Sequence, residues 1–301
     1  MTQRRFATYN LMDMFAGDDQ AARYAQVAEV VAGLRADVVA VQELTAATQP
    51  VAEAQVARLA EMTGMTATVT AGGQRPVHAA GAGGNRFAVG LLWRNSPAIV
   101  ARPDTLRVYG AASFFHSLVK LTLTVDGAPI TFASWHACPI GKYRRADEAE
   151  RVISAIGRAG PALLGCDGNT IGYATVTAAD GTRQFYDDDP YAKRPWQPGF
   201  VHTCTWEDDA GVIRSHHADR AAARILAAGG LHDVAPTLGE RWAPTAGHHP
   251  DDALGMDRRL DYVHATTDLL SRLIAYEVVD TALARTASDH LPAVATWTSQ
   301  P

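Results

Sequence analysis

The sequence lacks the features that mark membrane and secreted proteins. Its 301 residues include no apolar run of about 18, so no transmembrane helix is expected. The first residues, Met1-Thr2-Gln3-Arg4-Arg5-Phe6, contain no apolar core of the kind that a secretory signal needs. The three cysteines are far apart and odd in number, which does not suggest a disulfide framework: Cys138, Cys166 and Cys204. We therefore expect a cytoplasmic protein.

A basic excess is also missing, since 32 acidic residues stand against 27 lysines and arginines and the net charge is −5. Proteins that hold nucleic acid through many phosphate contacts usually carry a basic excess, so we expect any such binding to be weak and salt-sensitive. The most basic local run is Lys142-Tyr143-Arg144-Arg145. This run could contact a few phosphates, or it could be the solvated face of a helix.

Alternating and helical hydrophobic patterns are intermixed along the chain. Apolar alternation predicts strands over residues 5–10, 38–41, 114–125, 129–135, 162–164, 258–264 and 293–297. Helical spacing predicts helices over residues 51–62, 144–156 and 220–228, and another through Tyr24, Val27, Val31 and Leu34. This mixture, with a clear hairpin at 114–135, favours a mixed-sheet α/β domain over a parallel Rossmann type.

We find no linker and predict one domain over residues 1–301. Residues 170–217 stand apart because they show no sustained periodicity. A stretch of this length without regular elements is usually a functional loop, a lid or a family-specific insert.

Polar side chains follow the predicted strands where each strand ends. Residues 163–169, Leu-Leu-Gly-Cys-Asp-Gly-Asn, are typical of a turn when taken alone. Other strand ends carry matching chemistry, and the whole set is Asn10, Glu43, His136, Asp167, Asn169, Asp261, Asp289 and His290. Cysteine is absent from this set, which argues against structural zinc, whereas carboxylates and amides suit Mg²⁺ or Mn²⁺.

These segments resemble the endonuclease/exonuclease/phosphatase superfamily, which includes DNase I, the exonuclease III class, inositol polyphosphate 5-phosphatases and neutral sphingomyelinases. The matching segments occur in the family's order and are Thr8-Tyr9-Asn10, Gln42-Glu43, Ser134-Trp135-His136, Gly165-Cys166-Asp167-Gly168-Asn169, Arg259-Leu260-Asp261-Tyr262 and Ser288-Asp289-His290-Leu291-Pro292. The resemblance implies a DNase I-like α/β fold of the α+β type. This fold is a four-layer sandwich of two packed mixed β-sheets flanked by helices, with the active site at one edge.

The resemblance also implies which residues bind the metal and which residue acts on the attacking water. Glu43 would be the principal Mg²⁺ ligand, with Mn²⁺ as a possible substitute, and Asn10 and Asp289 would lie close to the metal. Asp167 would orient or deprotonate the attacking water.

For the phosphate, the resemblance implies that Asn169 holds an oxygen, that His136 and His290 contact it, and that Asp261 pairs with the ring of His290. An anionic phosphodiester repels a nucleophile unless its charge is neutralised, and a cation with two imidazoles would do this. A base beside the water contributes roughly 10²–10⁴-fold in rate. The residues leave one alternative open, in which Asp261 is only a salt-bridge partner of Arg258 or Arg259.

The resemblance indicates the bond class better than the substrate. We expect a Mg²⁺-dependent phosphodiesterase of nuclease type, and the alternatives are a phosphomonoesterase, acting on inositol phosphates or another small molecule, and a non-catalytic binding protein. His136 stands where abasic-site enzymes have a tyrosine, which separates the chain from that class. The partner would be a phosphoester, possibly nucleic acid, and no obligate protein partner is evident.

Further contacts to substrate are assigned to Lys142, Arg144, Arg145, His202 and Trp206. The same residues also have ordinary explanations, as a helix face, loop residues and a packed aromatic ring. Cys166 is interpreted as a small residue packed under the site and not as a nucleophile.

Overall fold

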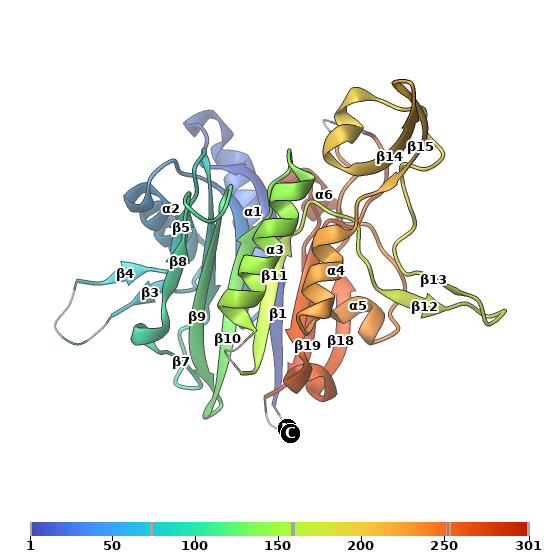
Figure 1. Cartoon of the computed structure of the whole chain (residues 1–301). Coiled ribbons are helices and arrows are strands. Elements are labelled where there is room, and N and C mark those ends of the chain that lie inside the picture. Colours follow the sequence, from blue (N-terminus) through green and yellow to red (C-terminus); the bar gives the residue numbers. More distant parts are fainter. Residues whose placement is uncertain are drawn as a thin grey trace.

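The computed structural model describes residues 2–70, 72, 75–157, 160–250, 252 and 254–299. Two large mixed sheets dominate this part of the chain (Figure 1). The first sheet has the strand order β18 (Leu273–Val278), β19 (Ala293–Thr298), β1 (Gln3–Met14), β2 (Val38–Thr45), β6 (Phe87–Trp93) and β5 (Ala80–Ala82). Its centre is parallel, since β1 pairs in parallel with β2 and antiparallel with β19.

The second sheet is built around the hairpin that the sequence predicts. Its strand order is β16 (Leu231–Asp233), β17 (Asp261–Thr266), β11 (Ala162–Asp167), β10 (Ala128–His136), β9 (Ser117–Val125) and β7 (Ile99–Ala101), and β8 (Arg107–Tyr109) also pairs with β9. The β9–β10 turn places Asp126 at φ 49° and Gly127 at φ 87°, as a two-residue turn matched to strand twist requires. The predicted strand over 258–264 begins later than expected, at Asp261.

The two sheets pack face to face over an apolar interior. Side chains alternate along each strand, so Phe6, Val38, Phe132, Leu163 and Val263 all point into this layer. At one point the sheets approach so closely that only glycine fits. A Cβ on Gly165 would lie 2.7 Å from the Cβ of Ala40 and 2.8 Å from that of Thr8. Gly165 therefore lies within β11 at the point where the two sheets are in close contact.

Helices cover the outer faces and complete four layers. The outer face of the first sheet packs against α1 (Ala21–Gly33), α2 (Gln49–Thr63) and α6 (Ala282–Ala287). Helices α3 (Lys142–Ile156) and α4 (Ala221–Ala228) cover the second sheet, where Figure 1 shows α3 in front of β10 and β11. The expected four-layer, DNase I-like sandwich is confirmed. Among the described residues, no helix has the length and apolar character needed to cross a membrane.

The expectation that residues 170–217 lack regular structure is wrong. This segment forms two hairpins, β12 (Thr175–Thr177) with β13 (Arg183–Phe185), and β14 (Cys204–Asp209) with β15 (Val212–Ala218). Both project from the sandwich in Figure 1. Many of their residues are exposed, so burial does not impose an apolar alternation that a sequence pattern could reveal.

Smaller elements complete the described chain. They are β3 (Thr68–Val69), which pairs with β4 (Val77–His78), the short helix α5 (Val234–Thr237), and the 3-10 helices η1 (Asp18–Gln20), η2 (Pro103–Thr105), η3 (Pro198–His202) and η4 (Thr267–Arg272).

Candidate active site

The two sheets bring the polar strand ends together. His136 pairs with Asp167 across the parallel strands β10 and β11, and Asp167 pairs with Asp261 across β11 and β17. Residues paired in register point to the same face, so all three side chains face the first sheet. In that sheet, Asn10 at the inner face of β1 pairs with Gln42 of β2.

The amide of Asn10 joins the sheets at the centre of this group. Its Nδ2 donates to Asp167 Oδ2 at 2.9 Å and to Glu43 Oε1 at 3.1 Å. Beneath it, Gln42 Nε2 donates to Ser134 Oγ at 3.0 Å, which is a second polar link between the sheets. Because both links are buried and hydrogen-bonded, they fix the relative position of the sheets where the site is formed.

Glu43 leaves the regular strand. Its φ is 62°, and the β2–β6 pairing shifts register between Val41 and Leu44. A non-glycine residue with this φ is uncommon and often marks a functional site. The shift lets Oε1 reach Asn10, while Oε2 accepts from the backbone N–H of Asp13 at 3.2 Å.

His290 and Asp261 form the tightest pair of the group. His290 Nδ1 lies 2.7 Å from Asp261 Oδ2, and both residues are buried. Burial alone would lower the pKa of His290, but the Asp261 carboxylate raises that pKa well above its usual value. His290 is therefore protonated, and its Nε2 lies 4.0 Å from Asp167 Oδ2. Asp261 has no part in the Arg258 or Arg259 ion pairs.

His136 has a different environment from the one expected. Its Nε2 lies 3.4 Å from Asp167 Oδ2 and 3.9 Å from Glu43 Oε1, but its Nδ1 is buried without a hydrogen-bond partner among the described residues. Burial, and then the charge of His290, lower the pKa of His136 to about 3. A neutral His136 can donate a hydrogen bond to a phosphate oxygen but does not offset the charge of the phosphate.

His116 is a site residue that sequence reasoning missed. Its ring stacks on that of His136 with centroids 3.8 Å apart and planes at 8°, and its Nδ1 lies 2.9 Å from Asn85 Oδ1. Burial, followed by His136, lowers the pKa of His116 to about 2, so the stacked rings are both neutral. The signal was in the predicted hairpin, because its register pairs Ser117 with His136 and places the preceding histidine beside the site.

Asn169 and Asp289 lie at the rim of the group. Asn169 has a left-handed φ of 45°, donates its backbone N–H to Asp167 Oδ1 at 2.9 Å, and donates Nδ2 to the carbonyl of Ala137 at 3.1 Å. This turn holds the Asp167 carboxylate in place. Asp289 is half-buried and follows Ser288, whose hydroxyl donates to the carbonyl of Asn10 at 2.7 Å.

The donor set fits a divalent cation. Oxygen and nitrogen atoms of Glu43, His136 and Asp167 lie within 4.8 Å of one another, and so do those of Asp167, Asp261 and His290. Burial and the nearby charge of Asp289 raise the pKa of Glu43 to about 7, although Asn10 opposes this. The carboxylates therefore repel one another, and a cation held by Glu43 with Asn10 and Asp289 would relieve that repulsion.

Two basic residues of the run at 142–145 have partners outside this group. Arg145 is fully buried and donates to the carbonyls of Cys138 and His202, at 2.8 and 2.9 Å. Lys142 Nζ donates to the carbonyl of Cys204 at 2.7 Å and lies 3.8 Å from the centroid of Trp206. Of the assigned contacts, Lys142, Arg145, His202 and Trp206 thus connect α3 to the 170–217 segment.

Arg144 is the one basic residue of that run with an exposed side chain. This side chain is 47% exposed, and its guanidinium lies over the ring of Phe115 and pairs with Glu148 at 3.4 Å. It remains available to a ligand, but it offers a single charge and not a cluster.

The fold was compared with those of known proteins. Neither a protein-family model nor a curated protein matches the sequence. Solved structures do match: an endonuclease/exonuclease/phosphatase family protein from Bacteroides thetaiotaomicron is 15% identical, with a TM-score of 0.62 over 98% of this chain and 94% of its own. The chain has the endonuclease/exonuclease/phosphatase fold.

Other proteins with this fold act on different substrates. TDP2 of D. rerio, solved with a single-strand DNA product, is 14% identical, with a TM-score of 0.61 over 99% of this chain and 100% of its own. A mannosyl-6-phosphatase of B. thetaiotaomicron VPI-5482 is 15% identical, with a TM-score of 0.60 over 97% and 98%. At these identities the endonuclease/exonuclease/phosphatase fold is shared, and the substrate of this chain has to be argued from its own residues.

Proposed function

We propose that the protein is a Mg²⁺-dependent hydrolase of phosphoester bonds, and that it acts as a phosphodiesterase of nuclease type. The observation that carries this proposal is the position of Asp167. Its carboxylate accepts from Asn10 and Asn169 and lies within 4.0 Å of Nε2 of both His136 and His290. A carboxylate held in this way is placed to orient a water molecule and remove its proton beside a phosphate.

The other residues divide the work of binding the phosphate. Protonated His290, held by Asp261, would donate to a phosphate oxygen and stabilise the charge that develops in the transition state. Neutral His136 would donate a further hydrogen bond. Asn169 positions the Asp167 carboxylate through its backbone N–H, and its side-chain Nδ2 donates to the carbonyl of Ala137. The turn at Asn169 would therefore form one wall of the phosphate site.

Glu43, Asn10 and Asp289 would hold the metal. When bound, Mg²⁺ supplies Lewis-acid polarisation of a phosphoryl oxygen and offsets the negative charge of the substrate. Mn²⁺ would substitute, because it takes the same oxygen ligands.

The test is hydrolysis of bis-p-nitrophenyl phosphate with Mg²⁺, with EDTA, and after Mg²⁺ or Mn²⁺ is restored. We expect activity to be lost with EDTA and recovered with either ion. Glu43→Gln should raise the concentration of Mg²⁺ needed for half-maximal activity. The matched control is Glu277→Gln, since that side chain is 54% exposed and pairs only with Arg5 in the described structure. Activity that survives EDTA would refute the metal dependence.

A substrate panel separates the alternatives. Plasmid DNA, RNA, inositol phosphates and p-nitrophenyl phosphate should be compared under the same Mg²⁺ conditions. Cleavage of p-nitrophenyl phosphate but not of its diester would favour a phosphomonoesterase. Absence of hydrolysis with every substrate and both ions would favour a binding protein with this fold.

A further inference from the structure

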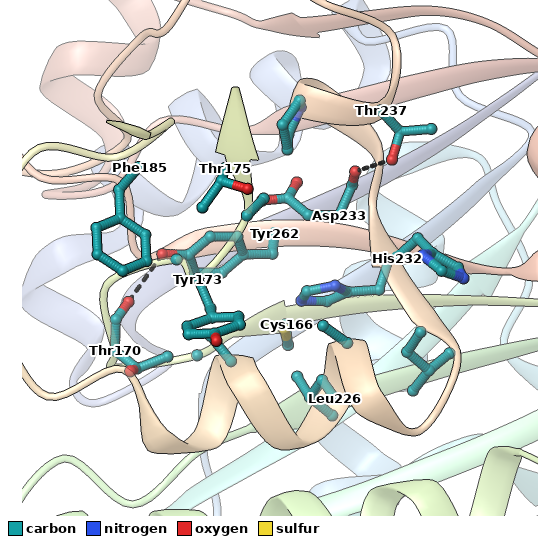
Figure 2. Close-up of a pocket in the computed structure, with 18 of the residues that line it drawn as sticks. Cys166, Thr170, Tyr173, Thr175, Phe185, Leu226, His232, Asp233, Thr237 and Tyr262 are labelled. Atoms are coloured by element: carbon teal, nitrogen blue, oxygen red, sulfur yellow. Dashed lines mark hydrogen bonds between the residues drawn. The ribbon is translucent and has the colours of Figure 1, made fainter. Parts of the chain in front are cut away.

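A cavity of about 490 Å³ lies on the opposite face of the second sheet from the catalytic residues. It is lined by residues of α4, α5 and the β12–β13 hairpin (Figure 2). Cys166 lines this cavity, whereas its neighbour Asp167 points to the other face of β11, as alternate residues of a strand must. The cavity and the active site are therefore separate and lie back to back across one strand.

Two aromatic rings with planes tilted by 53° form part of the cavity wall. Tyr173 and Phe185 are 39% and 41% exposed, and their ring centroids are 5.8 Å apart. The guanidinium of Arg220 lies 4.1 Å from the centroid of Phe185 and donates to the carbonyls of Gly172 and Asp187, which fixes this corner. Leu226 of α4 supplies an apolar side chain to the opposite wall, as Figure 2 shows.

A polar atom without a partner lies in the lining of the cavity. His264 is 4% exposed and stacks on Tyr262, and its buried Nδ1 has no hydrogen-bond partner among the described residues. Such an atom costs roughly 1–3 kcal/mol when nothing satisfies it. Burial lowers the pKa of His264 to about 4, so the ring is neutral and can form a hydrogen bond with an uncharged group.

The charge of the lining disfavours a cation. Asp233 is the acidic residue among the lining residues, and both of its carboxylate oxygens accept from Arg259, at 3.0 and 2.5 Å. Arg183 is exposed, and its Nε donates to Thr175 Oγ1, so its guanidinium adds a positive charge to the lining. Because the Asp233 carboxylate is paired, it would not repel an anionic ligand or attract a cationic one as an unpaired carboxylate would.

We propose that this cavity binds a planar, hydrogen-bonding heterocycle of nucleoside size, stacked on Phe185 with Tyr173 at its edge and with a polar ring atom directed to the imidazole of His264. The volume lies within the range of about 300–1,000 Å³ typical of small-molecule sites. The aromatic rings favour a flat ligand, and the neutral imidazole of His264 in the lining favours a ring that carries donors or acceptors over a plain hydrocarbon. The inference does not depend on the proposed hydrolase activity, because it uses none of the catalytic residues.

The experiment is calorimetric titration of the full chain with adenosine, guanosine, cytidine and uridine in EDTA. We expect at least one nucleoside to bind saturably. Phe185→Ala should weaken that binding about tenfold, since stacking of one base is worth roughly 1–3 kcal/mol. His264→Phe should also weaken it, because the ring shape stays and the nitrogen is lost. Tyr143→Ala is the matched control, being an exposed aromatic on α3 that does not line the cavity.

Three results would overturn the proposal. The first is that no nucleoside binds at millimolar concentration to wild type that folds normally by circular dichroism. The second is that binding is unchanged in both cavity variants but lost in His290→Ala, which would place the nucleoside in the active site. The third is that indole binds as tightly as the nucleosides and His264→Phe has no effect, which would leave an apolar cavity without the proposed selectivity.

Discussion

The protein buries two clusters of charged residues that look alike in the sequence and differ in structure. One contains Arg259 with Asp187 and Asp233, and the other contains Glu43, Asp167, Asp261 and His290. In the first, the guanidinium donates to both carboxylates at 2.5–3.0 Å, and Trp242 Nε1 donates to Asp187 Oδ1 at 3.0 Å. Burial would lower the pKa of Arg259, but the two carboxylates raise it well above its usual value.

The second cluster is not balanced in this way. Glu43 is a carboxylate whose pKa is raised to about 7 by burial and by Asp289, and the one imidazolium nearby is already paired with Asp261. The difference shows which buried charges have a structural role. The Arg259 cluster, in which the charges are matched, connects distant segments. The cluster around Glu43, in which charge remains unmatched, is the one that we propose to bind a cation and a substrate.

The largest effect should come from removing the central carboxylate of the unbalanced cluster. Asp167→Asn should lower the rate of bis-p-nitrophenyl phosphate hydrolysis by about 10²–10⁴-fold, since it removes the group that acts on water. The unfolding midpoint in urea should stay the same or rise, because like-charge repulsion near Glu43 decreases. Asp280→Asn, at an exposed pair with Arg285, is the control and should leave the rate unchanged. An active Asp167→Asn protein would show that the site is wrongly assigned.

Breaking the matched cluster should act on stability. Arg259→Met leaves two buried carboxylates without their partner and should lower the free energy of unfolding by about 3–5 kcal/mol in urea. Arg285→Met, which breaks an exposed pair, should cost less than about 1 kcal/mol. If Arg259→Met and Arg285→Met lower the free energy of unfolding by the same amount, the Arg259 cluster does not have the structural role assigned to it.

His264 provides a buried titratable group that belongs to neither cluster. Its pKa is about 4 in the folded protein, against an ordinary value of 6.5, because burial disfavours the charged ring. The unfolded chain therefore binds a proton at a higher pH, so this contribution to stability is complete above pH 6.5 and is lost as the pH falls toward 4. Between pH values above 6.5 and below 4, the free energy of unfolding should fall by about 3 kcal/mol because of this group.

Urea unfolding of wild type and His264→Phe from pH 7 to pH 4 checks this expectation. The variant should gain stability relative to wild type as the pH falls, while the acid sensitivity contributed by His116 and His136 remains in both proteins. A constant difference across this range would show that His264 does not titrate as stated.

The smallest effect should come from His116, which acts through His136. His116→Ala removes the ring stacked at 3.8 Å and should lower kcat roughly 10- to 100-fold through misplacement of His136. His116→Phe keeps an aromatic ring and should recover most of the rate. Equal losses in the two variants would assign the effect to the bond with Asn85 and not to stacking.

The sequence by itself predicted a mixed α/β domain, its principal helices and the β9–β10 hairpin, and the family resemblance of its short motifs implied the sandwich and the residues that meet at the strand ends. These features depend on local hydrophobic spacing and on short motifs, and both are visible in a linear sequence. The two hairpins of residues 170–217 were missed for the same reason, because exposed strands carry no apolar alternation.

Tertiary structure alone decided what each charged side chain does. Arg145 and Arg144 are neighbours in the sequence, yet one is buried against the carbonyl of His202 and the other is exposed. Arg259 pairs with Asp187, which is 72 positions away in the sequence. Asp261 is two residues after Arg259, yet it pairs with His290. The energy of a charge depends on its burial and on the partner within a few ångströms, and both are set by segments that are distant in the chain.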